Sequence, residues 1–308
     1  MNGVRGLTAA AWLVCAAIVP WLSGCIAPHG PAGDHELRAA TTAAQLAFGE
    51  GQLSLAAQMY ARALSRARAM DDSPAIADAA YNLAACLIEM GEYQQARDKL
   101  DEALAEAQRA GGRVIDVLLL KATVARLEKK PSDVFTAAEQ VLSHRPPPTG
   151  AERSQAYLIE AEAACDAGDS HTAARYMAQV NVAVLSSPTL QARLAEARGR
   201  IASLNKDWRG AATEFDRAAE LWRGAHRYSS MSRDLGHAAN AYAAAGLSAL
   251  AADRYYRAAR SAFGLGDTVA SMNLIATARA AARTAGAADL EARADALAAE
   301  IKAVPAGR

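Results

Sequence analysis

Cys25 is the residue whose place in the sequence points most directly to chemistry. A single positive charge, Arg5, precedes an apolar run over residues 7–20, and small residues come directly before the cysteine. A charged start, a short apolar core and small residues at a cleavage point are typical of a secretion signal. The run is short for a membrane span, although an uncleaved N-terminal membrane anchor is the alternative. The sequence therefore predicts a signal peptide over residues 1–24.

The residues Leu22, Ser23, Gly24 and Cys25 together resemble the lipobox of bacterial lipoproteins. The resemblance implies that Cys25 becomes the new N-terminus, takes a diacylglycerol on its thiol and is acylated again. Several acyl chains, each contributing about 0.8 kcal/mol per buried CH₂, give stable membrane anchoring. Ile26 follows the cysteine where an inner-membrane retention signal has aspartate. We therefore expect a lipidated tether over 25–33, attached to the outer membrane and facing the periplasm.

Other reactive constellations are absent from the sequence. Cys86 and Cys165 fall on separate predicted helices, where we expect buried thiols with no disulfide or metal. The six histidines are scattered, and neither a His-Glu-x-x-His nor a Gly-x-Ser-x-Gly motif occurs. We expect no cofactor, no metal and no enzymatic activity, although a triad assembled from distant residues is compatible with such a sequence.

Pairs of helices must position whatever else the chain carries. In the segment Leu83–Leu104 one apolar helix runs into Gly91, and a second begins at Tyr93 with apolar residues at helical spacing. Two helices joined by so short a turn pack antiparallel. The small residues Ala84 and Ala96 allow their backbones to approach closely.

This helix pair recurs along the chain with a period of about 38–40 residues. The small position of the second helix is filled in turn by Ala56, Ala96, Ala173, Ala211 and Ala251. The gap between Ala96 and Ala173 spans two periods, which predicts a further repeat with Val134 in the small position. A weaker unit follows Gly286. We therefore predict an all-α protein without a sheet.

The repeated residues resemble a tetratricopeptide repeat (TPR) array over roughly 37–300. The resemblance implies a right-handed α-solenoid of about six to seven helix hairpins. Because the period exceeds the family's value of about 34, each helix should be longer by roughly half a turn to a turn. Other helical solenoids with periods near 40 are the alternative. We expect N-terminal repeats over 34–145, a Pro-rich break at 146–150 that is either a hinge or a long loop, and C-terminal repeats over 151–308.

Local signals leave some assignments open. Ser73, Thr149 and Ser187 are predicted N-caps. The apolar run Val114–Leu120 is either buried or the floor of a groove. Basic residues outnumber acidic ones over 193–233, which indicates either a solvated helix face or a patch for anionic headgroups or an acidic partner. One further set, spaced by seven, is either core packing or a binding cage: Trp208, Phe215 and Trp222.

The whole chain has 33 basic and 33 acidic residues, which argues against nucleic acid as the partner. The TPR resemblance implies that the first helix of each pair lines a concave peptide groove. Alignment of the repeats places these residues there: Tyr81, Asn82, Thr123, Arg126, Glu162, Arg200, His237 and Asn240. We expect a lipid-anchored scaffold or adaptor for an envelope protein or peptide, such as an assembly factor, a pilotin-like factor or an enzyme adaptor. An envelope glycan- or lipid-binding protein is the alternative.

Overall fold

The computed structural model describes residues 34–303, which form fourteen α-helices and a short 3₁₀ helix without any strand. The predicted signal peptide, Cys25 and the tether lie outside the described residues. The chain divides between Glu128 and Lys129 into two compact units, here unit 1 and unit 2. Unit 1 contains α1 (His35–Gly49), α2 (Leu53–Ala69), α3 (Ser73–Glu89), α4 (Tyr93–Ala110) and α5 (Val114–Leu127). Unit 2 contains α6 (Pro131–Ser143), α7 (Gly150–Asp166), α8 (Ser170–Met177), η1 (Val182–Val184), α9 (Pro188–Leu204), α10 (Trp208–Gly224), α11 (Tyr228–Ala244), α12 (Ser248–Gly264), α13 (Thr268–Ala285) and α14 (Ala288–Ala303).

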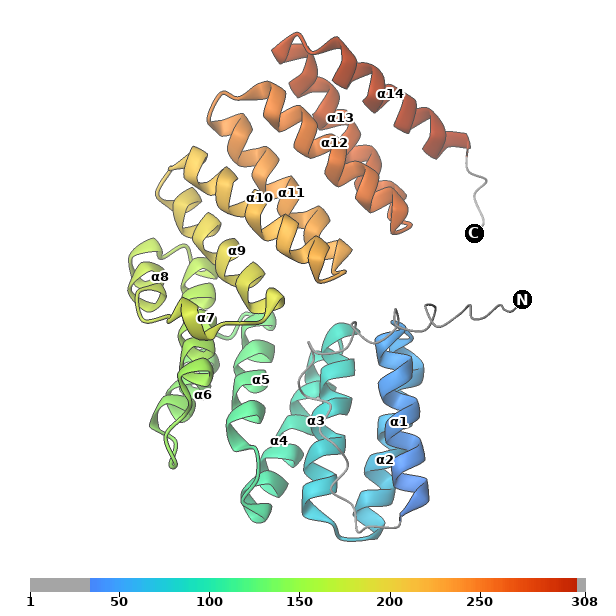
Figure 1. Ribbon diagram of the computed structural model, residues 1–308, viewed down its shortest axis with the longest axis vertical. Helices are drawn as coiled ribbons and strands as arrows, with labels where there is room; N and C mark the ends of the chain where they lie inside the picture. Colours follow the sequence, from blue (N-terminus) through green and yellow to red (C-terminus); the bar gives the residue numbers. More distant parts are fainter. Residues whose placement is uncertain (1–33, 304–308) are drawn as a thin grey trace, which may run out of the picture. The chain divides into compact units, whose positions relative to one another are not determined.

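Within each unit, consecutive helices form antiparallel hairpins that stack on one another (Figure 1). The second helices of the hairpins begin 38 to 40 residues apart, at Leu53, Tyr93, Pro131, Ser170, Trp208, Ser248 and Ala288. The helix at Pro131 confirms the repeat that the double-length gap predicted. Two 17-residue helices and two three-residue turns account for the 40-residue spacing. The predicted α-solenoid of TPR-like hairpins is therefore the observed fold.

A fully buried small residue occupies the same position of the second helix in each of the first six hairpins. Ala56, Ala96, Val134, Ala173, Ala211 and Ala251 all have 0 % of their surface exposed. Each is the fourth residue of its second helix, one turn after the hairpin turn. In the last hairpin the same position is Glu291, which pairs with Arg283. A charged residue there suits a terminal repeat, which has no neighbour to cover it.

The three-residue turns share one backbone conformation, in which a residue just after the helix is left-handed. The residue that follows it donates its backbone N–H to a carbonyl of the helix, as Asp207 does to Ala202 at 2.9 Å. Glycine meets this requirement at Gly246, with φ of 75°, whereas Lys206 adopts φ of 62° in the equivalent turn. A side chain on a left-handed residue clashes with the backbone.

We expect Lys206→Gly to raise the free energy of unfolding by about 0.5–1 kcal/mol, because glycine removes this clash. Gly246→Ala should lower it by about 1 kcal/mol for the opposite reason. Urea denaturation followed by circular dichroism measures both changes. Equal midpoints for the two variants and the wild type would contradict the assignment of the turns.

Two helices in unit 2 approach closely because one residue lacks a side chain. A Cβ added at Gly199 in α9 would lie 2.9 Å from the ring of Phe215 in α10. Phe215 is buried and also contacts the imidazole of His237, with ring centroids 5.1 Å apart. Trp222 is also buried, so packing rather than a binding cage explains Phe215 and Trp222.

The fourth hairpin departs from the pattern. Its second helix, α8, is only eight residues long and ends at Met177. The segment that follows is rich in valine and asparagine, which favour helices less than alanine or leucine do. Its apolar side chains still fill the core, since Val180 and Leu185 pack with Leu158.

Two of the three predicted N-cap residues cap their helices in the structure. Thr149 caps α7 through a capping box with Glu152, and Ser187 caps α9 by accepting the N–H of Leu190. The prediction for α3 was wrong, because Asp72 accepts the N–H of Ala75 and Ser73 is already helical. The carboxylate of Asp72 accepts this N–H, and its negative charge is also stabilised by the positive end of the helix dipole.

The unit boundary and the proline-rich segment are separate features. The chain divides at Glu128–Lys129, whereas residues 146–150 were expected to form the break. The prolines lie inside unit 2, in the connection between α6 and α7. The apolar start of α5 is core, as the burial of Val117, Leu118 and Leu119 establishes.

Candidate functional site

The first helices of the hairpins line a pocket in unit 1 and carry a network of ion pairs in unit 2. In each unit, we call the side that these helices form its first-helix face. It is built by α3 and α5 in unit 1 and by α7, α9 and α11 in unit 2. Each unit is described separately below.

Unit 1 has a pocket where α3, the end of α4 and the start of α5 meet. The pocket has a volume of about 210 Å³. It is lined by Pro74, Ala77, Asp78, Tyr81, Ala107, Ala110, Gly112, Arg113, Asp116 and Val117. Five of these ten residues are alanine, glycine or proline, whose short side chains leave space between the helices. The predicted groove residue Tyr81 is half-buried in its wall.

Charged groups of both signs line this pocket. Arg113 Nε donates to Asp116 Oδ2 at 2.5 Å, and Asp78 contributes a second carboxylate. Burial lowers the pKa of Arg113, but the hydrogen bond to Asp116 and the charges of Asp116 and Asp78 outweigh it and raise the pKa above its usual value. The guanidinium therefore stays charged, and the pocket carries two acidic groups against one basic group.

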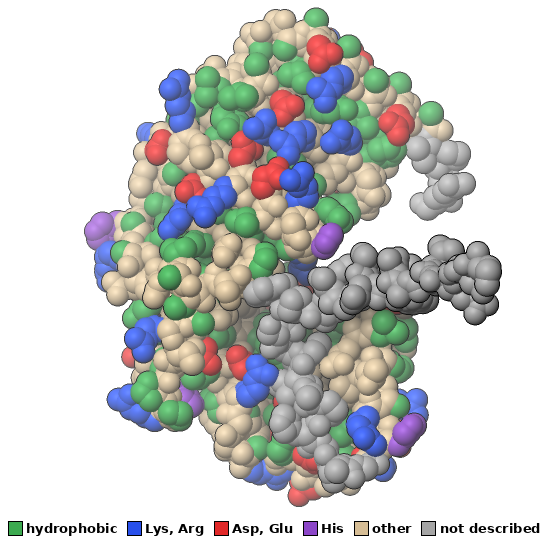
Figure 2. Space-filling model, in the orientation of Figure 1, with side chains coloured by type: hydrophobic (Ala, Val, Ile, Leu, Met, Phe, Trp, Pro, Cys, Tyr) green, Lys and Arg blue, Asp and Glu red, His purple; other side chains and the backbone are tan. Residues whose placement is uncertain are grey.

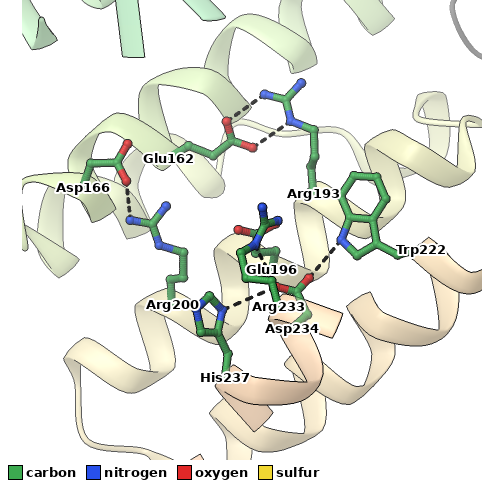
Figure 3. A network of polar contacts seen from close by, with 9 residues as sticks. All are labelled: Glu162, Asp166, Arg193, Glu196, Arg200, Trp222, Arg233, Asp234 and His237. Carbon is green, nitrogen blue, oxygen red and sulfur yellow. Dashed lines mark hydrogen bonds and ion pairs between the residues drawn. The ribbon is translucent and has the colours of Figure 1, made fainter. Parts of the chain in front are cut away.

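In unit 2 the first-helix face carries a ladder of ion pairs between neighbouring hairpins (Figure 3). Arg193 of α9 donates two hydrogen bonds, of 2.9 and 2.7 Å, to the carboxylate of Glu162 in α7. Two turns further along α9 and one turn further along α7, Arg200 donates to Asp166 at 2.6 Å. The next step joins α9 to α11, where Arg233 donates to Glu196 at 2.9 Å. Helical spacing places the members of each helix on one side.

Asp234 of α11 is the most deeply buried member of this network. It has 0 % exposure and accepts the indole N–H of Trp222 at 2.9 Å. His237 Nδ1 and Arg233 Nε lie 3.4 and 3.6 Å from its other oxygen. Burial of Glu196, together with the charge of Asp234, raises the pKa of Glu196, and Arg233 opposes this effect. The positive charge of Arg233 therefore partly offsets the repulsion between the carboxylates of Glu196 and Asp234.

Ion pairs neutralise part of the basic excess over 193–233. Arg193 and Arg200 bind acids of the preceding hairpin, and Arg223 pairs with Glu220 of its own helix. Figure 2 shows basic and acidic side chains interleaved over α10 and α12. Charge alone therefore does not single out this segment as a patch for an anionic surface.

A buried carboxyl group away from the ladder makes stability depend on pH. Glu160 of α7 is buried near Tyr176 of α8, whose ring stacks on Phe135. Burial raises the pKa of Glu160 to about 7, and the hydrogen bond from Tyr176 only partly offsets this. The folded state therefore favours the protonated acid. Its contribution is complete below the unfolded pKa of about 4.5 and is lost as the pH rises through 7.

We expect Glu160→Gln to be more stable than the wild type near pH 9, by up to about 3 kcal/mol, and to match it near pH 5. Glutamine resembles the protonated acid and carries no charge. The exposed residue Glu300 supplies a matched control, since Glu300→Gln should leave the pH dependence intact. Thermal unfolding across this pH range measures the effect, and parallel curves for wild type and Glu160→Gln would contradict the prediction.

The structure places the eight predicted groove residues in different settings. Glu162, Arg200 and His237 share the unit 2 network, whereas Tyr81 lines the unit 1 pocket. Asn82 is buried, with 5 % exposure, so it presents no surface for a ligand. Thr123 and Arg126 are half-buried on α5, and the Thr123 hydroxyl donates to the carbonyl of Leu119. Asn240 is exposed and accepts the hydroxyl of Tyr255.

Sequence reasoning missed the partners in these networks. Arg193, Glu196, Arg233 and Asp234 hold the unit 2 ladder together, and Asp78, Arg113 and Asp116 give the pocket its charge. A signal existed for the ladder, because its opposite charges on consecutive first helices lie 31 to 37 residues apart, near one period. The pocket had no comparable signal.

Comparison with known proteins supports the fold. No known family model matches the sequence, and no curated protein matches it. Solved structures do match. A Rap protein complexed with competence and sporulation factor is 15 % identical, with a TM-score of 0.52, over 87 % of this chain and 84 % of that one.

Two further structures show the same arrangement. A signal transduction ATPase with a tetratricopeptide repeat sensor, from Pyrococcus horikoshii, is 11 % identical with a TM-score of 0.55. The match covers 80 % of this chain and 40 % of that one. BtubC from P. vanneervenii is 16 % identical with a TM-score of 0.50, over 77 % and 93 % of the two chains. The fold of this chain is therefore that of the TPR α-solenoids.

Proposed function

We propose that this chain is a lipid-anchored scaffold of the bacterial cell envelope that binds a protein or peptide segment on its first-helix face. The observation that carries the proposal is the unit 1 pocket. It opens between two first helices of a TPR-type fold and combines short apolar side chains with a phenol and charged groups. This lining suits recognition of a side chain. A binding role rather than a catalytic one follows.

The position of the pocket favours a partner near the membrane. Alternate helices run parallel, so α1, α3 and α5 begin at the same edge of unit 1, at the bottom of Figure 1. The pocket is built from the first turns of α3 and α5 and therefore lies toward this edge. A tether of eight residues after Cys25 spans at most about 26–29 Å. In this proposal a bound segment stays within a short distance of the bilayer. No described helix is long and apolar enough to cross a membrane.

Co-purification tests the proposal. The tagged full chain and its Cys25→Ser variant are isolated from envelopes solubilised in mild detergent, and the accompanying proteins are identified. We expect a stoichiometric protein that is lost with Cys25→Ser. Recovery of the wild-type chain without any partner, or of Cys25→Ser in the same membrane fraction as the wild type, would overturn the scaffold or the anchor, respectively.

A direct ligand in the envelope, a glycan or a lipid, is the second candidate. Tyr81 favours it, because a half-buried aromatic ring in a pocket is a surface on which a sugar can stack. Sedimentation with purified cell wall separates the two candidates. Binding to cell wall that Tyr81→Ala abolishes would replace the protein partner with a glycan.

A further inference from the structure

We propose that the exposed side of α1 binds a second copy of this chain. This side, here the α1 end face, consists of the α1 residues that are exposed although the same positions of α3 are buried. Its members are His35, Glu36, Ala39, Thr42, Ala43 and Leu46. The face lies at one end of unit 1 and is separate from the pocket, so the inference goes beyond the scaffold function proposed above (Figure 1).

Comparison with the next hairpin identifies these positions as part of a helix-packing interface. α1 and α3 are equivalent helices, 40 residues apart, as are the α2 and α4 helices that follow them. The six equivalent residues of α3 are all buried: Ala75, Ile76, Ala79, Asn82, Leu83 and Cys86. In α3 the preceding hairpin supplies cover, since α2 packs against it. The α1 end face therefore continues an interface that the stacked hairpins already use.

The last helix of unit 2 shows how an end of stacked hairpins is closed in this chain. Three positions that are buried and uncharged in α12 carry charged residues in the equivalent places of α14, namely Glu291, Asp295 and Lys302. Charge at these positions suits contact with water. The α1 end face instead keeps apolar residues at Ala39, Ala43 and Leu46, and Leu46 is 64 % exposed. It is therefore not closed in the same way.

A second leucine enlarges the exposed apolar surface beside the hairpin turn. Leu55 lies in the first turn of α2 and is 42 % exposed, and Leu46 lies in the last turn of α1. The short turn between the two helices holds both leucines at the same end of the hairpin. A two-fold contact brings the same surface of two copies together, so it can remove these leucines from water in both copies at once.

The ion pairs beside the end face are balanced, which favours a second copy over a strongly charged partner. Glu36 pairs with Arg62 of α2 at 3.3 Å, and Arg66 pairs with Asp34 at 2.7 Å. Glu36 and Arg62 keep 52 % and 63 % of their side chains exposed. In a two-fold contact each copy can offer its base to the acid of the other, whereas two faces of a single sign would repel.

Cross-linking of the full chain in intact cells tests this inference. One exposed alanine of the end face is replaced, Ala43→Cys, and a flexible bismaleimide joins thiols that lie close together. Cys86 and Cys165 are buried, so the chain without the substitution gives the background. The matched control is Ala280→Cys, at an exposed alanine of α13. We expect at least about tenfold more product of twice the chain mass from Ala43→Cys than from Ala280→Cys, because a held contact raises the effective concentration of the two thiols.

A second substitution shows whether the apolar surface holds the copies together. Adding Leu46→Glu to Ala43→Cys should reduce the product to the level of the control, because it removes an apolar side chain from each copy and places like charges across the contact. Val269→Glu, the same change at a side chain 72 % exposed on α13, should leave the product unchanged. Circular dichroism verifies that each variant folds.

Each remaining outcome contradicts the inference. Equal yields from Ala43→Cys and Ala280→Cys would show that the end face meets no second copy. An undiminished product with Leu46→Glu would show that the apolar surface does not hold the contact. A product of another mass would assign the end face to a different protein.

Discussion

Replacing Arg193 with methionine should lower the free energy of unfolding by about 3 kcal/mol, one of the two largest losses of stability that we expect. The side chain of its partner Glu162 has only 6 % exposure, and Arg193 supplies two hydrogen bonds to it. Removing one member of a buried ion pair leaves the other charge poorly compensated in a region that excludes water. Urea denaturation measures the loss.

The companion variants give this prediction its sharpest test. A double replacement, Glu162→Met with Arg193→Met, should recover most of the stability, because apolar residues of similar size remove the uncompensated charge. Arg200→Met is the matched control. Its partner Asp166 keeps 38 % of its side chain exposed, so we expect a loss below about 1 kcal/mol. Similar losses for Arg193→Met and Arg200→Met would mean that burial does not govern the ladder.

The second large effect is expected at Trp222. Replacement by phenylalanine should lower the free energy of unfolding by about 2–3 kcal/mol, since the fully buried Asp234 loses the indole N–H at 2.9 Å. The substitution also removes volume from the contact with Ala192 and Ala218. The midpoint of urea denaturation measures the change.

A second tryptophan in the same helix provides a control. Its replacement shows what the change from indole to phenyl costs where no hydrogen bond to a buried carboxylate is lost. Trp208 lies half-buried at the start of α10, so Trp208→Phe should cost less than about 1 kcal/mol. Asp234→Asn tests the same bond from the other side, because an amide oxygen still accepts from Trp222. A larger loss for Trp208→Phe than for Trp222→Phe would contradict the role given to Asp234.

The unit 2 ladder changes how the first-helix face should be probed. Charge reversal at Arg200 or His237 disturbs contacts within or between hairpins and therefore affects stability as well as any partner. Variants in the unit 1 pocket, such as Asp78→Asn, change charge with less disturbance of shape. Partner binding is best tested there.

The sequence by itself determined the hairpins. A helix needs only local spacing of apolar residues, and the turns need a left-handed residue, so the period, the hidden repeat at Val134 and the cap at Thr149 could be read along the chain. The small positions were predictable for the same reason, since each recurs at the same place after a hairpin turn. One local prediction failed at Ser73, where the neighbouring residue Asp72 caps the helix instead.

Only the tertiary structure decided which polar residues meet. Glu162 and Arg193 lie on different hairpins, and their contact depends on the rotation of one helix against the next, which a period alone does not fix. Asn82 was predicted for the groove and is buried, because one helical position, about 100°, separates it from Tyr81. The pocket depends on alanines and glycines of three helices converging, and short side chains carry no sequence signal of the space between them.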